Sequence, residues 1–323
     1  MASVRRRAGE SINIEVFIVG APQLDLKLVE GLLEFGRSHP DWRFALRGSG
    51  FRYSAGWLRR HRVSGMLALI DAEPVARPLR AAGVPWVHLL PRLPVAHHFV
   101  DLDNHAIGRM GAETLLSLGF SRFAFCGIGT PWGKRREAGF RERLAEAGMR
   151  CEATDIPFMT SEDWILPPRA ERVIGQWVAR LGPNTAVMAA QDQLANRFVD
   201  QCLQRGRRVP EDIAVLGAGN HDLLCLCSRA PISSVDTGVS TVALRGAGLL
   251  ERLLLGKRSP RSILVPPAGV VVRRSTDVLA FDDALVRAAV AHIRDHAVEG
   301  IKVDDLIGAF GVSRQTLARR FAR

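Results

Sequence analysis

Short runs of apolar residues alternate with longer amphipathic segments over most of the chain. The runs are rich in β-branched and aromatic residues, as strands are, and the segments between them carry apolar residues at helical spacing. This alternation predicts parallel sheets covered by helices on both faces, an α/β architecture. The expected strands are EVFIVG, RFALRG, GMLALI, PWVHLL, RFAFCGIG, TAVMAA, IAVLGAG and AGVVVRR. The expected helices include residues 24–37, 104–118, 134–147, 191–204 and 239–255.

These units fall into two groups. The first covers residues 12–118 and the second residues 120–230, while residues 231–274 are expected to complete both. Residues 1–274 are therefore predicted to form two lobes of doubly wound parallel sheet.

The pattern changes near the end of the chain, where strands stop and three helical segments follow. We expect a separate all-α module over residues 281–323. Asp282 is the predicted N-cap of its first helix, which carries Leu285, Ala289 and Ile293 at i, i+4 and i+8.

The final segment, KVDDLIGAFGVSRQTLARRFAR, is typical of a helix-turn-helix. Ser313 is expected to cap the second helix, and Leu317 and Phe321 to pack inward. The candidate DNA-binding residues on the other sides of this helix are Arg314, Gln315, Thr316, Arg319, Arg320 and Arg323. Arginine presents a forked donor that suits both guanine and phosphate. We expect Gln315 and Arg319 to contact bases and Arg320 to contact phosphate.

The alternative for this segment is an amphipathic helix with a solvated basic face. The turn spacing and the acidic first turn of the preceding helix favour DNA binding.

Composition narrows the class of protein. The chain has 323 residues, 47% of them hydrophobic, and a net charge of +11, which excludes a disordered or collagen-like protein. Its five cysteines are scattered, which favours a reducing cytoplasm over a disulfide framework. The first apolar run is too short for a secretory signal, and no run has transmembrane length.

The tail, with its V-x-D-L…GVS-x-x-x-L-x-R-R-F pattern, resembles the first helix-turn-helix of the AraC-type DNA-binding domain. The rest of the chain resembles the LacI/GalR-like sugar-sensing domain. Four stretches carry this second resemblance: VDLDNHAIGRMGAETLLSLGF, WGKRREAGFRERLAEAG, NTAVMAAQDQLANRFVDQCLQRGRRVPEDIAVLGAGN, and ISSVDT followed by GVVVRRSTDVLA. Together they resemble the xylose-operon regulators, which join the two domains. The resemblance implies a periplasmic-binding-protein-like sensor followed by part of an AraC-type domain.

The resemblance also implies a ligand site. Its candidate residues are Asp103, Trp132, Arg136, Gln191 and Asn220, with Arg136 as the arginine that clamps the ligand. Carboxylate, amide and guanidinium groups suit sugar hydroxyls, and an aromatic face suits the apolar C–H surface of a sugar. Purely structural roles remain open for three residues near it. Asn104 and Asp192 are candidate helix caps, and Trp132 is a candidate core residue.

Two departures from the family pattern bear on the ligand. Gly219 in GAGN stands where the family usually has an acidic residue, and APQLDLKLVEGLL lacks the Tyr-Gly-Arg motif that often lies near this position. The expectation is therefore a sugar or a related polar molecule, without a commitment to xylose.

Metal and enzyme chemistry are the competing interpretations. HHFVDLDNH places His97, His98, Asp101, Asp103 and His105 close together, but not at the spacing of a known metal site. The sequence has no nucleophile elbow, P-loop or dinucleotide-binding motif, so neither an enzyme nor a cofactor is expected.

The preferred function is a cytoplasmic, ligand-responsive transcription regulator that binds DNA and no membrane. The alternative is an exported solute-binding protein, which shares the two-lobed architecture. The tail matches one of the two helix-turn-helix units of an AraC-type domain. We therefore expect either a fragment or a homodimer formed through the sensor lobes, and weak DNA binding by the monomer.

Overall fold

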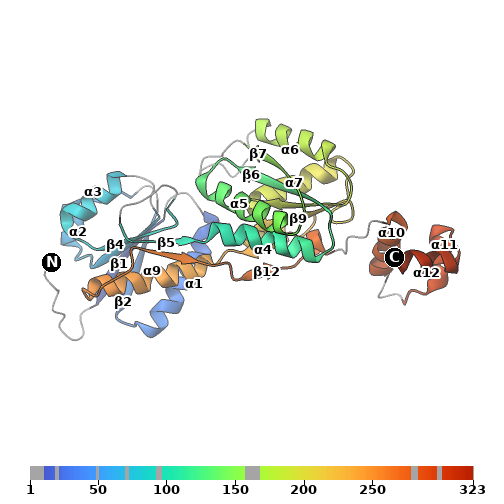
Figure 1. Ribbon diagram of the computed structural model, residues 1–323. Helices are drawn as coiled ribbons and strands as arrows, with labels where there is room; N and C mark the ends of the chain where they lie inside the picture. Colours follow the sequence, from blue (N-terminus) through green and yellow to red (C-terminus); the bar gives the residue numbers. More distant parts are fainter. Residues whose placement is uncertain are drawn as a thin grey trace.

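Figure 1 shows a computed structural model of the protein. The structure describes residues 11–18, 22–48, 51–69, 73–91, 97–156, 168–277, 283–296 and 300–322. Two sheets of mostly parallel strands, each covered by helices, form two lobes, and three further helices form a C-terminal module. The predicted two-lobed α/β architecture is confirmed.

The first sheet is parallel throughout its described pairings. In spatial order it contains β11 (Ser262–Val265), β5 (Phe99–Leu102), β4 (Trp86–Leu89), β3 (Gly65–Leu69), β1 (Ile12–Ile18) and β2 (Trp42–Arg47). Its helices are α1 (Pro22–Ser38), α2 (Ala55–Arg60), α3 (Glu73–Ala82) and α9 (Val239–Leu254). Successive residues of a strand face opposite sides, so Val16 joins the core with α1 and α9 while Phe17 joins a second core with α2 and α3.

The second sheet contains β12 (Gly269–Val271), β10 (Ser233–Asp236), β9 (Ile213–Ala218), β8 (Thr185–Ala189), β6 (Arg122–Ile128) and β7 (Cys151–Ile156). The pairing of β10 with β12 is antiparallel, and the other described pairings are parallel. Its helices are α4 (Asn104–Ser117), α5 (Pro131–Glu146), α6 (Pro168–Arg180), α7 (Asp192–Gln204) and α8 (Asp222–Leu226), and a 3₁₀ turn, η1 (Arg274–Thr276), packs against β9 and β10.

The helix α4 packs on the second lobe, although the sequence division at residue 118 groups it with the first. Gly108 of α4 and Gly139 of α5 explain the difference. A Cβ atom at Gly108 would overlap the Arg136 carbonyl oxygen, and one at Gly139 would overlap the His105 carbonyl oxygen. The two helices therefore approach with their backbones in contact, and the chain leaves the first lobe after β5.

Three crossings between the lobes lie side by side: β5 to α4, β10 to α9, and β11 to β12. The Asp103 amide donates to the Val265 carbonyl at 2.8 Å, and the Ala268 amide donates to the Asp236 carbonyl at 2.8 Å. Gly238 makes the turn into α9 with φ of 81°, a conformation that favours glycine. The ends of β5 and β10 are thus brought together where the lobes meet.

The C-terminal module consists of α10 (Ala284–His296), α11 (Val303–Phe310) and α12 (Arg314–Phe321). Ala289, Leu306 and Leu317 form its buried centre, one residue from each helix. Phe321 was expected in this core, but it is 43% exposed, so that prediction was wrong. The predicted cap Asp282 lies outside the described residues, and the neighbouring Asp283 accepts hydrogen bonds from the Leu285 and Val286 amides.

Candidate functional site

Arg136 lies on α5 with its guanidinium buried between two strand ends. The residue is 6% exposed. Its Nε donates to Asn104 Oδ1 at 2.9 Å, and its Nη1 donates to the Ala190 carbonyl oxygen at 2.6 Å. Asn104 follows β5 of the first sheet and Ala190 follows β8 of the second. The guanidinium therefore joins the carboxyl ends of strands from both lobes, the edge at which open α/β sheets bind ligands.

The charge of Arg136 is poorly solvated. Burial lowers the pKa of its guanidinium to about 10, while the negative charges of Asp192 and Asp101 act to raise it. The group is still a cation at neutral pH. Its Nη2 has no hydrogen-bond partner among the residues that the structure describes. Arg136 thus has donors left for the oxygen atoms of a ligand.

Trp132 lies one turn before Arg136 and is brought together with it. The Arg136 Cζ atom is 4.7 Å from the centroid of the Trp132 ring, a distance typical of a cation–π contact. Trp132 packs against the core but is only partly buried. Both roles weighed for this residue, core and ligand contact, are therefore compatible with its position.

Asp103, and not the candidate cap Asn104, caps α4. Asp103 Oδ1 accepts a hydrogen bond from the Ala106 amide at 2.9 Å, which makes Asp103 the N-cap of α4. Asn104, the predicted cap, is buried at 3% exposure and holds Arg136 instead. The ligand role expected for Asp103 stays a prediction.

Gln191 and Asp192 also differ from the expected arrangement. Gln191 takes the N-cap position of α7, although its side chain makes no capping hydrogen bond. The predicted cap Asp192 is buried, and its carboxylate accepts from the Ser234 hydroxyl at 2.5 Å and the His221 amide at 2.8 Å. Burial raises the pKa of Asp192, and these two hydrogen bonds oppose the rise. Asp192 therefore connects α7 to β10 and α8.

Asn220 is held in a left-handed conformation with φ of 51°. Its Nδ2 donates to Asp236 Oδ2 at 3.2 Å, and its Oδ1 accepts from Arg273 Nη2 at 2.8 Å. Asp236 also accepts from Lys27 of the first lobe at 3.3 Å. The sequence interpretation missed Lys27 and Asp236, although Asp236 lies within the quoted stretch ISSVDT.

Gly219 has a physical reason to be glycine. Its φ is +132°, and a Cβ atom there would lie 2.9 Å from Asp192 Oδ2. An acidic side chain at this position would begin against the buried Asp192 carboxylate, and like charges so close repel strongly. The positive φ and the nearby Asp192 carboxylate both favour glycine at this position.

Two ion pairs cross between the lobes near these residues. Lys27 on α1 pairs with Asp236 on β10, and Asp101 on β5 pairs with Arg135 on α5 at 3.4 Å. Burial raises the pKa of Asp101, while the Leu102 amide and Arg135 act to lower it. The lobes therefore meet through side chains that lie beside the candidate ligand residues.

The helix-turn-helix is formed as the sequence predicts. Gly311 ends α11 with φ of 62°, and the Ser313 hydroxyl caps α12 by accepting from the Thr316 amide at 3.1 Å. Gln315 and Arg319 are exposed and have no partner among the described residues. Both side chains are therefore available for a contact outside the module.

The other predicted DNA-binding residues are partly engaged. Thr316 shares a hydrogen bond with Ser313 at 2.9 Å. Arg314 pairs with Asp304 at 3.4 Å, and Arg320 pairs with Asp283 at 2.6 Å. Arg323 lies outside the described residues.

The histidines of HHFVDLDNH point to separate partners. His97 contacts His88 at 3.3 Å, His98 contacts the Pro260 carbonyl oxygen at 2.8 Å, and His105 contacts Glu142 at 3.0 Å. Within the described ranges no three metal-binding side chains come together. No helix in that part of the chain is long and apolar enough to cross a membrane.

The two-lobed fold, the polar residues at its strand ends and the helix-turn-helix define a ligand-responsive, DNA-binding transcription regulator. Residues 112–276 match the model of the periplasmic binding protein-like domain. The xylose operon regulatory protein of Escherichia coli K12 is 32% identical over 309 residues, which cover 92% of this chain and 78% of that protein. Its Haemophilus influenzae counterpart is 26% identical over 312 residues, 92% of this chain and 79% of that protein. The chain belongs to the xylose operon regulatory protein family.

Solved structures agree with this assignment. The structure of the xylose-binding transcription activator xylR has a TM-score of 0.75 and 30% identity, and covers 98% of this chain and 82% of that one. A dimeric Lac repressor at 18% identity has a TM-score of 0.64 over 83% of this chain and 99% of its own, and shows the fold alone. These relatives are regulators rather than enzymes.

Proposed function

We propose that the two lobes bind a sugar or a related polar small molecule, and that this ligand changes how the C-terminal module binds DNA. The observation that carries the proposal is Arg136, a buried guanidinium with an unused Nη2 at strand ends of both lobes. Trp132 beside it offers an aromatic face. A ligand that contacts both lobes stabilises one arrangement of them, and it shifts the equilibrium by its difference in affinity between arrangements.

The chemistry of the site supports a ligand rich in hydroxyl groups. Arg136 supplies donors, Asp103 and Asp236 supply acceptors, and Gln191 and Asn220 supply both. A relative of this family is described as xylose-binding. Gly219 stands where the family usually has an acidic residue, so we assign the class of ligand and not xylose itself.

Calorimetry against pentoses, hexoses and sugar acids tests the ligand site. We expect one of these classes to bind the unmodified protein, and Arg136→Lys to lose most of the affinity, because lysine cannot reproduce the planar fork. Arg141→Lys is the matched control, since Arg141 lies on the same helix with its side chain 45% exposed. Equal affinity of the unmodified protein and Arg136→Lys would remove Arg136 from the site.

For DNA, we propose that Gln315 and Arg319 contact bases and that Arg314 and Thr316 contact the sugar-phosphate backbone of the DNA. The exposure of Gln315 and Arg319 on the second helix of a helix-turn-helix supports this assignment. As a regulator that binds DNA, the protein is expected in the cytoplasm.

We further propose that two copies pair through the sensor lobes. Leu26 and Leu33 on α1, and Leu223 and Leu226 on α8, are between 59% and 65% exposed. Exposed leucines at i, i+7 favour contact with another protein surface, and a Lac repressor with the same fold is described as dimeric. Sedimentation should show dissociation on Leu33→Glu and Leu226→Glu, but not on Leu264→Glu at another exposed position. If the unmodified protein sediments as a monomer at all concentrations, the proposed pairing is wrong.

A further inference from the structure

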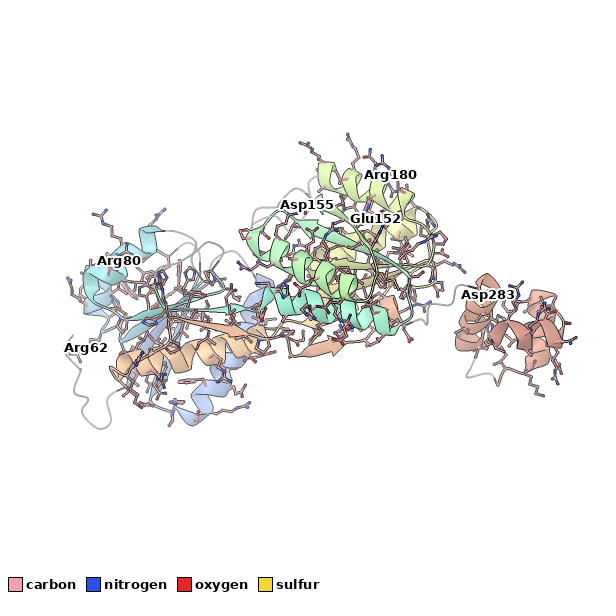
Figure 2. The ribbon with its side chains drawn as sticks, in the orientation of Figure 1. Arg62, Arg80, Glu152, Asp155, Arg180 and Asp283 are labelled. Carbon is pink, nitrogen blue, oxygen red and sulfur yellow. The ribbon has the colours of Figure 1, made fainter. Side chains whose placement is uncertain are left out.

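Asp283 lies where the chain from the sensor enters the C-terminal module, as its label in Figure 2 shows. Its carboxylate makes two kinds of contact. Oδ1 accepts hydrogen bonds from the Leu285 amide at 2.9 Å and the Val286 amide at 3.3 Å, so Asp283 caps α10. Oδ2 accepts from Arg320 Nη1 at 2.6 Å. One carboxylate thus joins the start of the module to its recognition helix, α12.

The contact with Arg320 differs from the Arg314–Asp304 pair, the other ion pair among the described residues of the module. The Asp283 side chain is 21% exposed and is held in place by the start of α10. In the Arg314–Asp304 pair both side chains are more than two-thirds exposed, at 69% and 80%. An ion pair whose acid is already fixed loses less side-chain entropy than one between two free side chains. The Asp283–Arg320 pair is therefore the better suited to hold α12 in one orientation.

The recognition helix needs such a contact because its packing is slight. Leu317 is its one residue in the buried cluster of the module, while Phe321 in its last turn is 43% exposed. A two-turn helix attached at one buried side chain can tilt about that point. Arg320, one turn after Leu317 in the helix, supplies a second attachment, to α10. The direction in which Gln315 and Arg319 point depends on both attachments.

We propose that Asp283, acting through Arg320, is a positioning residue for sequence-specific DNA binding. The pair orients α12 so that Gln315 and Arg319 reach the bases, and it makes this orientation depend on the entry of the chain into the module. This inference rests on the DNA-binding function. It differs from the phosphate contact expected of Arg320 from the sequence, and the pair that Nη1 makes with Asp283 in the absence of DNA supports the positioning role.

The test uses the full chain, a duplex selected by the unmodified protein from a random pool, and a scrambled duplex of the same composition. Asp283→Asn removes the charge and keeps the helix cap, since asparagine and aspartate cap about equally well. Asp304→Asn is the matched control, because it changes the net charge by the same amount and breaks the other arginine pair. We expect Asp283→Asn to lower the ratio of selected to scrambled affinity about tenfold, the size of one impaired base contact. Asp304→Asn should leave this ratio unchanged.

Arg320 variants separate positioning from direct contact. Arg320→Ala should reproduce the loss of Asp283→Asn, the double variant should lose no more than either single one, and Arg320→Lys should recover part of the ratio. The proposal is overturned if Arg320→Ala weakens both duplexes equally and lowers the salt slope by about one, as a lost phosphate contact does. It is also overturned if Asp283→Asn tightens both duplexes. If no duplex is selected at all, the DNA-binding assignment fails, and the positioning role falls with it.

Discussion

Arg136 in the sensor and Arg319 in the C-terminal module show two ways of using arginine for recognition. Arg136 is 6% exposed, its guanidinium is bonded to Asn104 and Ala190, and burial lowers its pKa to about 10. Arg319 is exposed and has no partner among the described residues. The sensor arginine is thus part of the packing of its lobe, while the module arginine is carried by a helix that folds without it. Substitutions should therefore affect stability in the first region and DNA recognition in the second.

Replacing each arginine in turn is the most direct test of this difference. Arg136→Met should lower the free energy of unfolding by about 3 kcal/mol, because Asn104 Oδ1 and the Ala190 carbonyl lose their buried donor. Arg319→Met should change it by less than about 0.5 kcal/mol. Urea denaturation of both variants, followed by circular dichroism, measures the difference. Similar losses from the two substitutions would show that the regions do not differ in this way.

Glycine substitutions sharpen the same contrast. Gly139→Ala should cost roughly 2 kcal/mol, because its Cβ would overlap the His105 carbonyl oxygen where α4 and α5 touch. Gly308 lies within α11 and has no atom within 4 Å of an added Cβ. Gly308→Ala should therefore stabilise the module by about 0.4 to 1 kcal/mol. Thermal unfolding measures both effects, and a destabilising Gly308→Ala would mean that this face of α11 is covered.

A third prediction concerns DNA. Arg319→Ala and Gln315→Ala should change the preferred base at single positions, each by about tenfold, or ~1.4 kcal/mol. Lys302→Ala, at the exposed start of α11, is the control and should leave the preference unchanged. Selection from a random DNA pool gives the preferences directly. Identical selected sequences from all three variants would place base recognition elsewhere in the protein.

The sequence predicted those parts of the fold that local patterns determine. The helix-turn-helix, with its Ser313 cap, has a clear apolar period and a glycine turn. Strands β5, β7, β10 and β11 were not expected, because each has only four to six residues and FVDL, CEATDI, SSVD and SILV all contain polar residues that keep them from standing out as apolar runs. They are strands because neighbouring strands pair with them.

The candidate site was less predictable, since its contacts join distant residues. Lys27 and Asp236 are 209 positions apart, and Arg136 and Asn104 are 32 apart. The resemblance to a known family brought Arg136, Trp132 and Asn220 to attention, but it did not say which atoms they bind. Asp103 and Asn104 could not be told apart as caps, because either side chain can cap a helix. Phe321 has the right spacing to pack with Leu317, yet none of the described residues covers it and it is 43% exposed.

The smallest effects concern pH, and they should have opposite signs in the two regions. Burial raises the pKa of Asp101 in the sensor, despite the lowering effects of the Leu102 amide and Arg135. An acid whose pKa is higher in the folded state favours folding at low pH, and this contribution is lost as the pH rises through the folded pKa. For Asp283, burial acts to raise the pKa, but the hydrogen bonds from Arg320 and the two α10 amides lower it overall. Its contribution is therefore present at neutral pH and is lost as the pH falls through its folded pKa.

Asparagine variants of Asp101 and Asp283 measure this difference in the sign of the stability change. Asp101→Asn should be slightly more stable than the unmodified protein at neutral pH, and the two should converge on acidification. Asp283→Asn should be slightly less stable at neutral pH and should likewise converge with the unmodified protein in acid. All six tryptophans precede residue 178, so tryptophan fluorescence follows the sensor alone, while amide hydrogen exchange of α10 follows the module. If both variants are less stable than the unmodified protein at neutral pH, Arg135 stabilises the Asp101 carboxylate more than burial destabilises it, as Arg320 does for Asp283. Burial would then not distinguish the two carboxylates.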